Sequence, residues 1–397
     1  MSKLSNKVGP PVEGADFFGR EQEIFEAWSE LSDNNHLLIT APRRVGKSSL
    51  VKRLIHEARG NNWKTAYIDV QAVTDEIGFF KTFAETIKKE NESWFAKCKS
   101  KALSSLDELI GKLEVEFKTE SGAIKVKWAG TRSSEINQKI EDLLDGTGDF
   151  LIVIDELPFF LMRMEKEDEG KERISDFLHQ LRAYRQKTHN KIRWIFCGSV
   201  GLDTFTEKHN LSESFNDLLS FSISAFDEKT ARDFLEKLGS DNHLPLSVDN
   251  VDDILNKLGW PLPFFLQLIF KQLKRIKGPH FPKLITKQDV EDAYSRILQE
   301  TPALKTWEER LQLQLNGDDA SHCKAILTHI SQDRKGVTRR QLFSILYKRI
   351  NDSDKCEDKL SHYIKLLERD GYLLFHADRY SFRSPLLRDY WYNLRVR

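Results

Sequence analysis

The stretch Ala41-Pro42-Arg43-Arg44-Val45-Gly46-Lys47-Ser48 decides the predicted fold. Its spacing is that of a phosphate-binding loop, with alanine in place of the first glycine. The apolar run 36–40 precedes it, and an amphipathic segment begins at Ser48. A strand, a loop and a helix in this order direct backbone N–H groups and a helix N-terminus toward an anion. The short Gly-Lys-Ser pattern also arises by chance, but the flanking strand and helix argue against coincidence.

The residue types in this loop have chemical reasons. Gly46 lets the backbone approach a nucleotide closely, Lys47 reaches the β- and γ-phosphates, and the Ser48 hydroxyl ligates magnesium. We therefore predict ATP and Mg²⁺ as cofactors. The side chains of Arg43 and Arg44 either touch phosphate or adenine, or point into solvent. The predicted nucleotide-binding residues of this stretch are Pro42, Arg43, Arg44, Val45, Gly46, Lys47, Ser48 and Ser49.

A second motif, 150–156, is an apolar run that ends in Asp155 and Glu156. Asp155 is predicted to hold magnesium through water, and Glu156 to polarise the attacking water. An ordinary strand with a solvated acidic turn has the same pattern, and the upstream loop favours the catalytic interpretation. Ser199 ends the next apolar run, where it either senses the γ-phosphate or the attacking water, or is a turn residue. The predicted catalytic residues are Glu156, Lys47 and Ser199.

Apolar runs alternate with helical patterns from residue 17 to residue 226. Runs without polar interruption are typical of strands that are buried on both faces. Their alternation with helices predicts an α/β fold with the parallel sheet of a P-loop NTPase. The predicted strands are 36–40, 64–70, 150–156, 192–199 and 218–224.

The segment 92–145 interrupts this alternation between the second and third predicted strands. It is mostly charged and helical, but 113–119 and 123–130 alternate apolar with charged residues. Such alternation predicts a half-exposed β-hairpin at 113–130. The insertion is either a partner-specific surface or a solvated helical ornament.

We predict four parts in chain order. An N-terminal lead-in over 1–16 is flexible or draped, and the P-loop NTPase core covers 17–226. A helical lid follows at 227–305, because the strand patterns stop after Phe226. The last part, 306–397, is predicted to be a winged-helix domain. Its helical patterns cover 320–331, 338–349 and 357–369, and its short strands cover 372–375 and 379–383.

Composition excludes several classes of protein. The 397 residues contain 61 Lys and Arg and 61 Asp and Glu, so no overall field attracts nucleic acid or an anionic membrane. No stretch approaches the roughly 18 apolar residues of a membrane span, and the first residues lack the apolar core of a signal peptide. The four cysteines have no metal-ligand spacing. We predict a cytoplasmic protein without a membrane partner.

With these motifs, the chain resembles the prokaryotic ATPases of the STAND class, which are kin of AAA+ proteins and of origin-recognition ATPases. The resemblance spans nearly the whole chain in the right order. Its motifs are Phe18-Gly19-Arg20-Glu21, Pro42-Arg43-Arg44-Val45-Gly46-Lys47-Ser48, Ile154-Asp155-Glu156, Cys197-Gly198-Ser199, Gly259-Trp260-Pro261 and Tyr380-Ser381-Phe382-Arg383-Ser384-Pro385.

The resemblance implies further site residues. Gly19 and Arg20 would lie near the adenine, and Pro261 in the helical lid would lie close to the base or ribose. A simple interhelical turn also explains Gly259-Trp260-Pro261. Proteins of this class act as switches, in which ATP and ADP hold different arrangements of core, lid and winged helix. Arg182 and Arg185 follow the acidic strand but are predicted to face solvent, so an arginine finger is not evident.

The C-terminal part has two alternative roles. Thr338-Arg339-Arg340-Gln341 predicts a capping box, and the elements after it predict a helix-turn-helix with a wing, which can bind duplex DNA. Acidic residues on the candidate reading helix would be repelled by phosphates, which favours docking to protein or within the chain. The predicted DNA contacts are Arg334, Lys335, Arg339 and Arg340 on phosphates, and Lys359, His362 and Lys365 in the groove.

Together these patterns predict an ATPase. It would bind Mg-ATP and hydrolyse it slowly, as a conformational switch that controls assembly or the binding of an unknown protein partner or a second copy. The alternative is a DNA-binding protein of a mobile-element, replication or defence system, with ATP as a regulatory or structural ligand. A third hypothesis, a scaffold that does not hydrolyse ATP, is opposed by the intact Glu156.

Overall fold

The structure is a computed structural model. It describes residues 3–91, 149–188, 191–199, 211–278, 284–300, 302–315 and 317–397, with single residues at 108, 111, 138, 140, 202, 205 and 209. The predicted hairpin at 113–130 lies outside the described residues. The chain forms two compact units, which we call the sheet unit (Arg20–Ala41 and Lys47–Ile223) and the helical unit (Met1–Gly19, Pro42–Gly46 and Ser224–Arg397).

Five parallel strands form the sheet of the sheet unit, in the order β2-β3-β4-β1-β5. They are β1 (His36–Ala41), β2 (Lys64–Asp69), β3 (Phe150–Asp155), β4 (Ile192–Ser199) and β5 (Leu218–Ser222). The helices of this unit are α1 (Glu21–Ser32), α2 (Lys47–Gly60), α3 (Glu76–Glu90), α7 (Leu157–Met164) and α8 (Gly170–Thr188), with a short 3-10 helix at Ser212–Phe215. The predicted parallel α/β sheet is confirmed.

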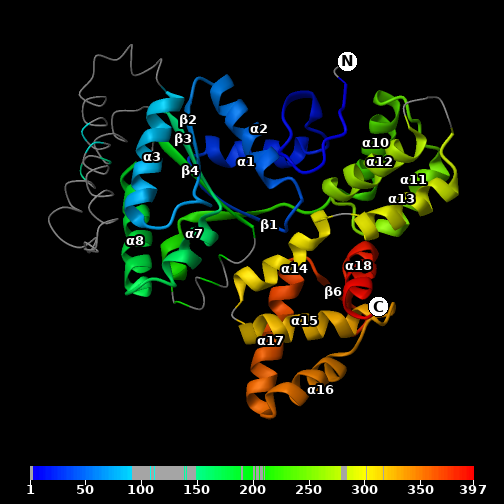
Figure 1. The fold of residues 1–397 in the computed structure, drawn as a ribbon. Helices are drawn as coiled ribbons and strands as arrows, with labels where there is room; N and C mark the ends of the chain where they lie inside the picture. Colours follow the sequence, from blue (N-terminus) through cyan, green and yellow to red (C-terminus); the bar gives the residue numbers. More distant parts are fainter. Residues whose placement is uncertain are drawn as a thin grey trace. The chain divides into compact units, whose positions relative to one another are not determined.

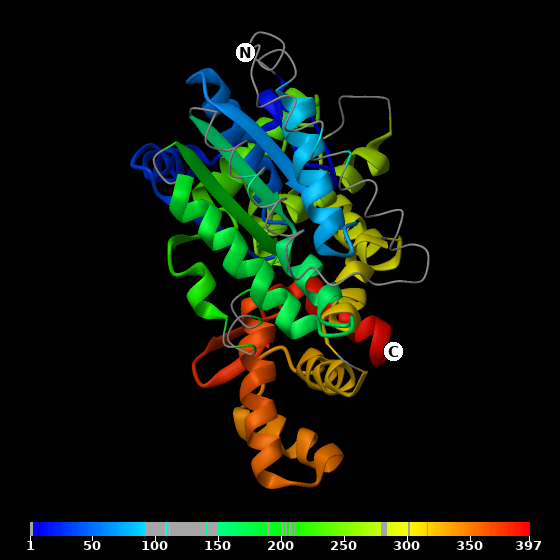
Figure 2. The same cartoon turned by 90° about the vertical axis from the view of Figure 1, so that its left-hand side faces the viewer.

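Helices cover both faces of this sheet (Figure 1, Figure 2). Alternate residues of a strand point to opposite faces, so an apolar run can fill two layers at once. On one face, α3, α7 and α8 pack against Ile152, Trp194 and Phe196. On the other, α1 and α2 bury their apolar stripes, including Leu31 and Leu54. All six residues of β3 are buried, which explains why this strand has no polar residue before its end.

The register of the strands brings their carboxyl ends to one edge. Ala41 at the end of β1 is level with Ser199 of β4, and Asp69 of β2 is level with Asp155 of β3. In open parallel sheets, ligands bind outside the carboxyl ends of the strands. The two motifs of the sequence therefore meet at this edge.

Helix α7 was not predicted. Its sequence, LPFFLMRM, continues the apolar run of β3 and lacks the polar residues of an amphipathic helix. Pro158 lies at its first turn, where a proline is tolerated because the missing N–H has no helical partner.

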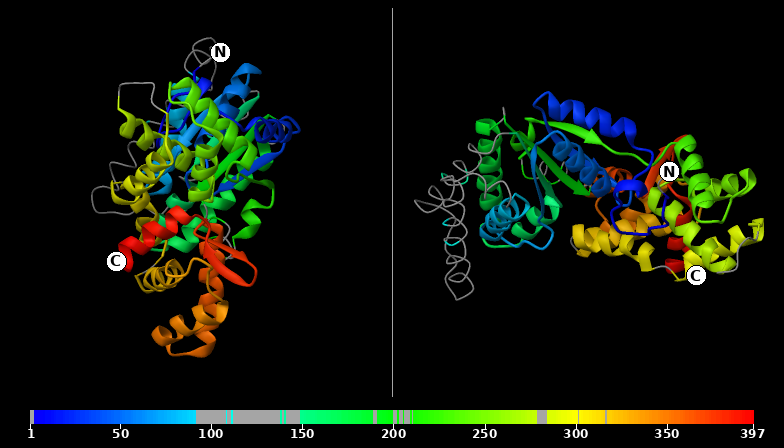
Figure 3. Two further views of the ribbon diagram at one scale, coloured as in Figure 1. Left: turned by 90° about the vertical axis from the view of Figure 1, so that its right-hand side faces the viewer. Right: turned by 90° about the horizontal axis from the view of Figure 1, so that it is seen from above.

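In the helical unit, four helices from the segment predicted to be a lid pack against one another (Figure 3). They are α10 (Glu228–Asp241), α11 (Val248–Leu258), α12 (Pro263–Lys277) and α13 (Lys287–Glu300). The N-terminal segment, with the 3-10 turn Gly14–Asp16, is draped over this unit rather than free. Its Leu4 N–H donates to Asp241 Oδ2 at 2.8 Å, and Asn6 Nδ2 donates to Gln267 Oε1 at 2.6 Å.

The remaining elements follow in chain order. They are α14 (Pro302–Gln314), α15 (Gly317–Ser331), α16 (Arg339–Ile350), α17 (Ser353–Arg369), the antiparallel pair β6 (Leu373–His376) and β7 (Arg379–Phe382), and α18 (Pro385–Arg395). The capping box that begins α16 is present, with Thr338 N–H donating to Gln341 Oε1 at 2.8 Å. Within the described part of the chain, every helix is too short or too polar to span a lipid bilayer.

Candidate functional site

A buried ion pair joins the first residue of α2 to the last residue of β3. The Lys47 ammonium contacts Asp155 Oδ1 directly, and Glu156 Oε1 lies 3.6 Å from Lys47 Nζ. Lys47 is 7% exposed and Asp155 is 2% exposed. The loop lysine and both acidic residues of the second motif thus lie in one cluster, although 108 positions separate Lys47 from Asp155.

Asp155 accepts hydrogen bonds from three further donors. Ser48 Oγ donates to Oδ2 at 3.3 Å, Tyr67 Oη donates to the same oxygen at 2.7 Å, and Glu156 N–H donates to Oδ1 at 2.9 Å. A carboxylate has about four lone-pair positions, so these donors and Lys47 fill its capacity. The carboxyl plane of Asp155 is therefore held in one orientation.

Burial and charge act in opposite directions on this pair. Burial alone would raise the pKa of Asp155, but the Lys47 ammonium and the hydrogen bonds lower it below its usual value. Burial alone would lower the pKa of Lys47, but the neighbouring acidic groups raise it. Both shifts favour the charged forms, so Lys47 is a cation whose charge the protein's own carboxylates neutralise.

Glu156 has a strained backbone. Its φ of 61° and ψ of 29° lie in the left-handed region, where it precedes α7. A non-glycine residue in this region costs roughly 1–3 kcal/mol and is found most often at functional sites. Its side chain is 21% exposed, in contrast to Asp155. Glu156 is thus the carboxylate of the cluster that solvent water can reach.

Tyr67 is the residue of this cluster that the sequence did not single out. It lies on β2, level with Val153 of β3, and its hydroxyl reaches Asp155. Burial and the Asp155 charge raise its pKa, so the hydroxyl stays protonated and remains a donor. The only signal in the sequence is a polar group three residues before the end of the predicted strand 64–70, which is too common to be specific.

We expect Tyr67→Phe to lower the stability of the protein by about 1–2 kcal/mol, since a hydrogen bond to a charged group is lost from a half-buried position. Equilibrium unfolding in urea measures this change. The phenyl ring keeps the packing, so the loss reports the hydroxyl alone. Stability equal to wild type would show that Tyr67 does not hold Asp155.

The loop residues 42–46, which connect β1 to α2, belong to the helical unit. Arg44 adopts a left-handed conformation with φ of 66°, and its guanidinium lies 4.5 Å from the centre of the Phe264 ring of α12. The solvated interpretation of Arg44 is therefore wrong, because its guanidinium packs on α12. Val45 is fully buried, and Gly46 has a φ of 101° that favours glycine.

Gly19 lies against the first turn of α10, and Pro261 lies against the segment that leads into this helix. Gly19 has a φ of 66°, and a Cβ there would come within 2.4 Å of Thr230 Cγ2. The carbonyl oxygen of Pro261 accepts a hydrogen bond from Phe226 N–H at 3.3 Å. Arg20 is buried in the sheet unit and pairs with Glu23. The contacts of these three residues with a nucleotide stay a prediction.

The end of β4 has a packing role. Gly198 is level with Thr40 inside the sheet, and a Cβ there would come within 2.5 Å of Pro158 Cγ. Glycine is therefore needed for α7 to approach β4, and this residue is not in a turn. Ser199 is the last residue of β4, but its side chain lies outside the described part of the structure.

The prediction that Arg185 faces solvent was wrong. Its guanidinium is 1% exposed and binds the Asp217 carboxylate through two hydrogen bonds, of 2.7 and 2.8 Å. Asp217 precedes β5, 32 positions away, so no local pattern links the two residues. Arg182 is half-buried.

Two of the predicted DNA contacts are paired within the protein. Arg339 binds Glu357, and Lys359 Nζ lies 2.7 Å from Asp319 Oδ1. These pairs neutralise side chains that would otherwise meet phosphates. The other predicted contacts are exposed, and they are Arg334, Lys335, Arg340, His362 and Lys365.

Known proteins resemble this chain in sequence and in fold. Residues 17–261, more than half of the chain, match a family described as an ATPase domain predominantly from Archaea. The Walker-type ATPase of Pyrococcus abyssi is similar in structure, with a TM-score of 0.63 and 18% identity over 97% of this chain and 99% of that chain. The ORC2 protein of Aeropyrum pernix, in ADPNP and ADP complexes, has a TM-score of 0.54 and 13% identity over 99% of this chain and 97% of that chain.

At these identities the structural likeness concerns the fold, and it confirms the predicted P-loop NTPase class. No curated protein matches the sequence.

Proposed function

The chain belongs to the family of ATPase domains that come predominantly from Archaea, and from this premise we propose that it slowly hydrolyses Mg-ATP as a conformational switch. The cluster of Lys47, Ser48, Asp155 and Glu156 carries this proposal. Lys47 would exchange Asp155 for the β- and γ-phosphates. The oxygens of Ser48 and Asp155 are the hard ligands that Mg²⁺ prefers. The ADPNP and ADP complexes of the Aeropyrum pernix ORC2 protein, which has a similar fold, support the proposal that this protein binds a nucleotide.

Glu156 would activate the water. Its carboxylate accepts a proton from the attacking water while the water oxygen bonds to the γ-phosphorus. The bond from this phosphorus to the bridging oxygen of ADP breaks, and ADP leaves. When bound, Mg²⁺ would neutralise part of the negative charge that develops on the phosphates. Ser199 at the end of β4 is proposed to contact the γ-phosphate or the water.

The switch is supported by a packed chain of aromatic rings in the helical unit. It begins at Arg44 of the loop, which lies on Phe264 of α12. Phe264 and Phe265 have ring centres 6.0 Å apart, and Phe265 lies 6.4 Å from Trp307 of α14. Trp307 lies 5.2 Å from Tyr372, the residue before β6, and its carbonyl accepts a hydrogen bond from the Tyr372 hydroxyl.

This series of aromatic rings connects the loop to the C-terminal part through close contacts. Trp260 packs on Trp307, and a Cβ on Gly371 would come within 2.4 Å of the Trp260 ring. Well-packed interiors transmit displacements because they have few voids. Since Gly46 is bonded to Lys47, a movement of Lys47 toward phosphate would displace the loop. We propose that Arg44 and Phe264 carry this displacement to the lid.

We expect nucleotide to change the protease sensitivity of the C-terminal part in the wild type but not in Phe264→Leu. The smaller side chain removes the ring on which Arg44 lies, so the loop and α12 lose their contact. Limited proteolysis in Mg-ATP and in Mg-ADP measures the difference. Phe25→Leu is the matched control, because Phe25 is 67% exposed on α1. An unchanged nucleotide effect in Phe264→Leu would remove this route.

We propose that residues 306–397 are a winged-helix domain and that the switch controls assembly or the docking of a protein. The three helices α15, α16 and α17, followed by the β6–β7 pair, support this assignment. The internal pairs of Arg339 and Lys359 favour protein over DNA as the partner. Size-exclusion profiles in ATP and in ADP test for a nucleotide-dependent assembly.

One observation favours the alternative, a DNA-binding protein that ATP regulates. Residues 306–397 contain 17 Lys and Arg against 13 Asp and Glu, a net charge of +4, although the whole chain is balanced. A local basic domain can bind phosphates by releasing counterions. A DNA-binding function would be supported if the affinity for duplex DNA fell with increasing salt. The affinity should then fall further in Arg334→Gln and Arg340→Gln. If both variants bound duplex DNA as tightly as the wild type, DNA binding would be excluded as the role of Arg334 and Arg340.

A further inference from the structure

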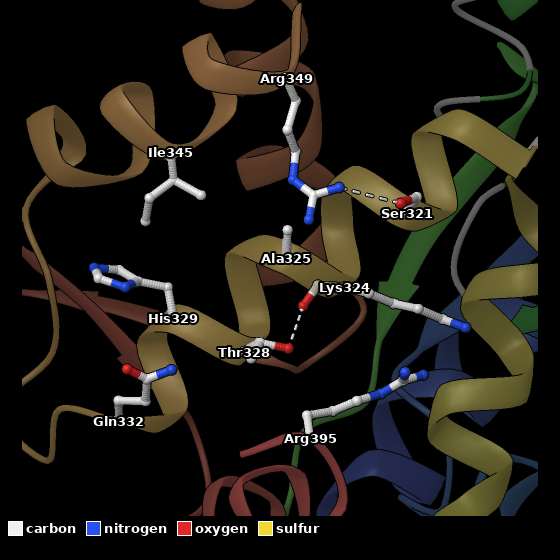
Figure 4. A pocket seen from close by; sticks show the side chains of 9 residues that line it. All are labelled: Ser321, Lys324, Ala325, Thr328, His329, Gln332, Ile345, Arg349 and Arg395. Atoms are coloured by element: carbon white, nitrogen blue, oxygen red, sulfur yellow. Dashed lines mark hydrogen bonds between the residues drawn. The ribbon is translucent and has the colours of Figure 1, made fainter.

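A pocket lies in the C-terminal part of the helical unit, between α15, α16 and the end of α18 (Figure 4). Its volume is about 360 Å³, which is within the range of sites for small molecules. Seven of the nine residues that line it have polar or basic side chains, although their aliphatic parts also contribute to the wall. They are Ser321, Lys324, Thr328, His329, Gln332, Arg349 and Arg395, with Ala325 and Ile345 as the apolar members.

The positive charges of this pocket exceed the negative ones. Lys324 Nζ lies 3.2 Å from Glu308 Oε1 of α14, and Arg395 binds the same oxygen. One carboxylate thus serves two cations. Among the described residues, no carboxylate pairs with the third cation, Arg349, which is exposed. About two positive charges therefore stay without a counterion.

The neutral groups of the pocket complete a set of donors. Figure 4 shows Arg349 reaching from α16 toward Ser321 of α15, and the distance from Nη1 to Oγ is 3.4 Å. This bond is long, so the guanidinium is not firmly held and is available to a ligand. Lys324 and Arg395 extend toward one side of the same pocket. Guanidinium, ammonium and hydroxyl groups together are the donors that bind phosphate oxygens in proteins.

We propose that this pocket binds the phosphate of a small phosphomonoester, with Arg349, Lys324 and Arg395 as its cationic contacts. A phosphomonoester carries about −1.5 to −2 charges at neutral pH, which matches the uncompensated charge. A carboxylate, or a single phosphate of a nucleic-acid backbone, supplies only one negative charge. The ligand would compete with Glu308 for Lys324 and Arg395. This site is separate from the Lys47–Asp155 cluster and does not depend on ATP hydrolysis.

Ribose 5-phosphate is the probe for this site. Calorimetric titration of the full chain in saturating Mg-ADP, which occupies the phosphate loop, should detect its binding. Arg349→Gln should weaken it at least about tenfold, because a hydrogen bond between charged groups is lost. Lys348→Gln is the matched control, since Lys348 is an exposed neighbour outside the pocket, and its affinity should stay within about twofold of wild type.

A second variant keeps the test independent of folding. Arg395→Gln should also weaken binding, whereas Arg349→Lys should recover part of it, because a charge returns without the planar fork. Equal affinity in Arg349→Gln and Lys348→Gln would overturn the proposal. It would also be overturned if ribose 5-phosphate did not bind and a duplex bound in a manner that requires Arg349. Failure of ATP hydrolysis would leave each of these results unchanged.

Discussion

Glu156→Gln should lower the turnover of ATP by about 10²–10⁴-fold, the usual contribution of a general base. Glutamine has nearly the same shape but cannot accept the proton of the attacking water. ATP affinity should stay close to that of the wild type, because Lys47 and Asp155 keep their buried contact without Glu156. Phosphate release and equilibrium binding of ATP, measured on the same preparation, separate these two effects.

Glu169→Gln is a matched control for this change. Glu169 is an exposed glutamate whose φ of 56° lies in the same left-handed region as that of Glu156. Any cost that glutamine brings to this backbone conformation appears in both variants. Turnover should therefore fall in Glu156→Gln alone. Equal turnover in Glu156→Gln and wild type would mean that another group activates the water.

Lys47→Ala should abolish ATP binding and lower stability by about 3 kcal/mol. Removing one partner of a buried ion pair typically costs 3–5 kcal/mol, because the other charge stays buried. Asp155 keeps its bonds from Tyr67, Ser48 and Glu156 N–H, which places the expected loss at the lower end. Urea unfolding measures the stability, and titration with a fluorescent ATP analogue measures binding.

The pH dependence of Lys47→Ala identifies the cause of its instability. Without the ammonium, the effect of burial on Asp155 is no longer offset by a neighbouring positive charge, so the pKa of Asp155 should rise. A folded pKa above the unfolded one gives a contribution that is present at low pH and is lost as pH rises through the folded pKa. The variant should therefore approach the stability of the wild type in acid.

Asp155→Asn in the Lys47→Ala background should recover stability at neutral pH, without recovery of ATP binding. The neutral amide removes the buried charge that Lys47 no longer neutralises. Lys52→Ala, on the same helix, controls for the loss of a lysine from α2. If the double variant were as unstable as Lys47→Ala, the ion pair would not be the source of the effect.

The sheet and the two motifs could be predicted because their signals are local. Each strand is a continuous apolar run, and the loop and the acidic pair are short motifs at strand ends. Both motifs follow the carboxyl ends of predicted parallel strands, and these ends meet at one edge of a sheet. In consequence, the clustering of Lys47 with Asp155 was expected from two separate segments, and the structure places them together.

The contacts that could not be predicted join residues far apart in the chain. Tyr67 reaches Asp155 across 88 positions because β2 and β3 are neighbours, which no pattern near Tyr67 indicates. Arg185 is buried only because Asp217 meets it from a different segment. Arg44 packs on Phe264 through a tertiary contact of the helical unit. Solvent exposure was predicted for Arg185 and was one of two alternatives for Arg44, because the partner of each lies in a distant part of the sequence.

The release of inorganic phosphate from ATP by the purified wild-type protein in Mg²⁺ tests the central claim most directly. We predict a slow, sustained release that stops on chelation of Mg²⁺ and that exceeds the release by Glu156→Gln at least about a hundredfold. ATP that binds tightly and is released unhydrolysed, at a rate equal in wild type and Glu156→Gln, would contradict a catalytic role for this cluster. The nucleotide would then be a structural ligand.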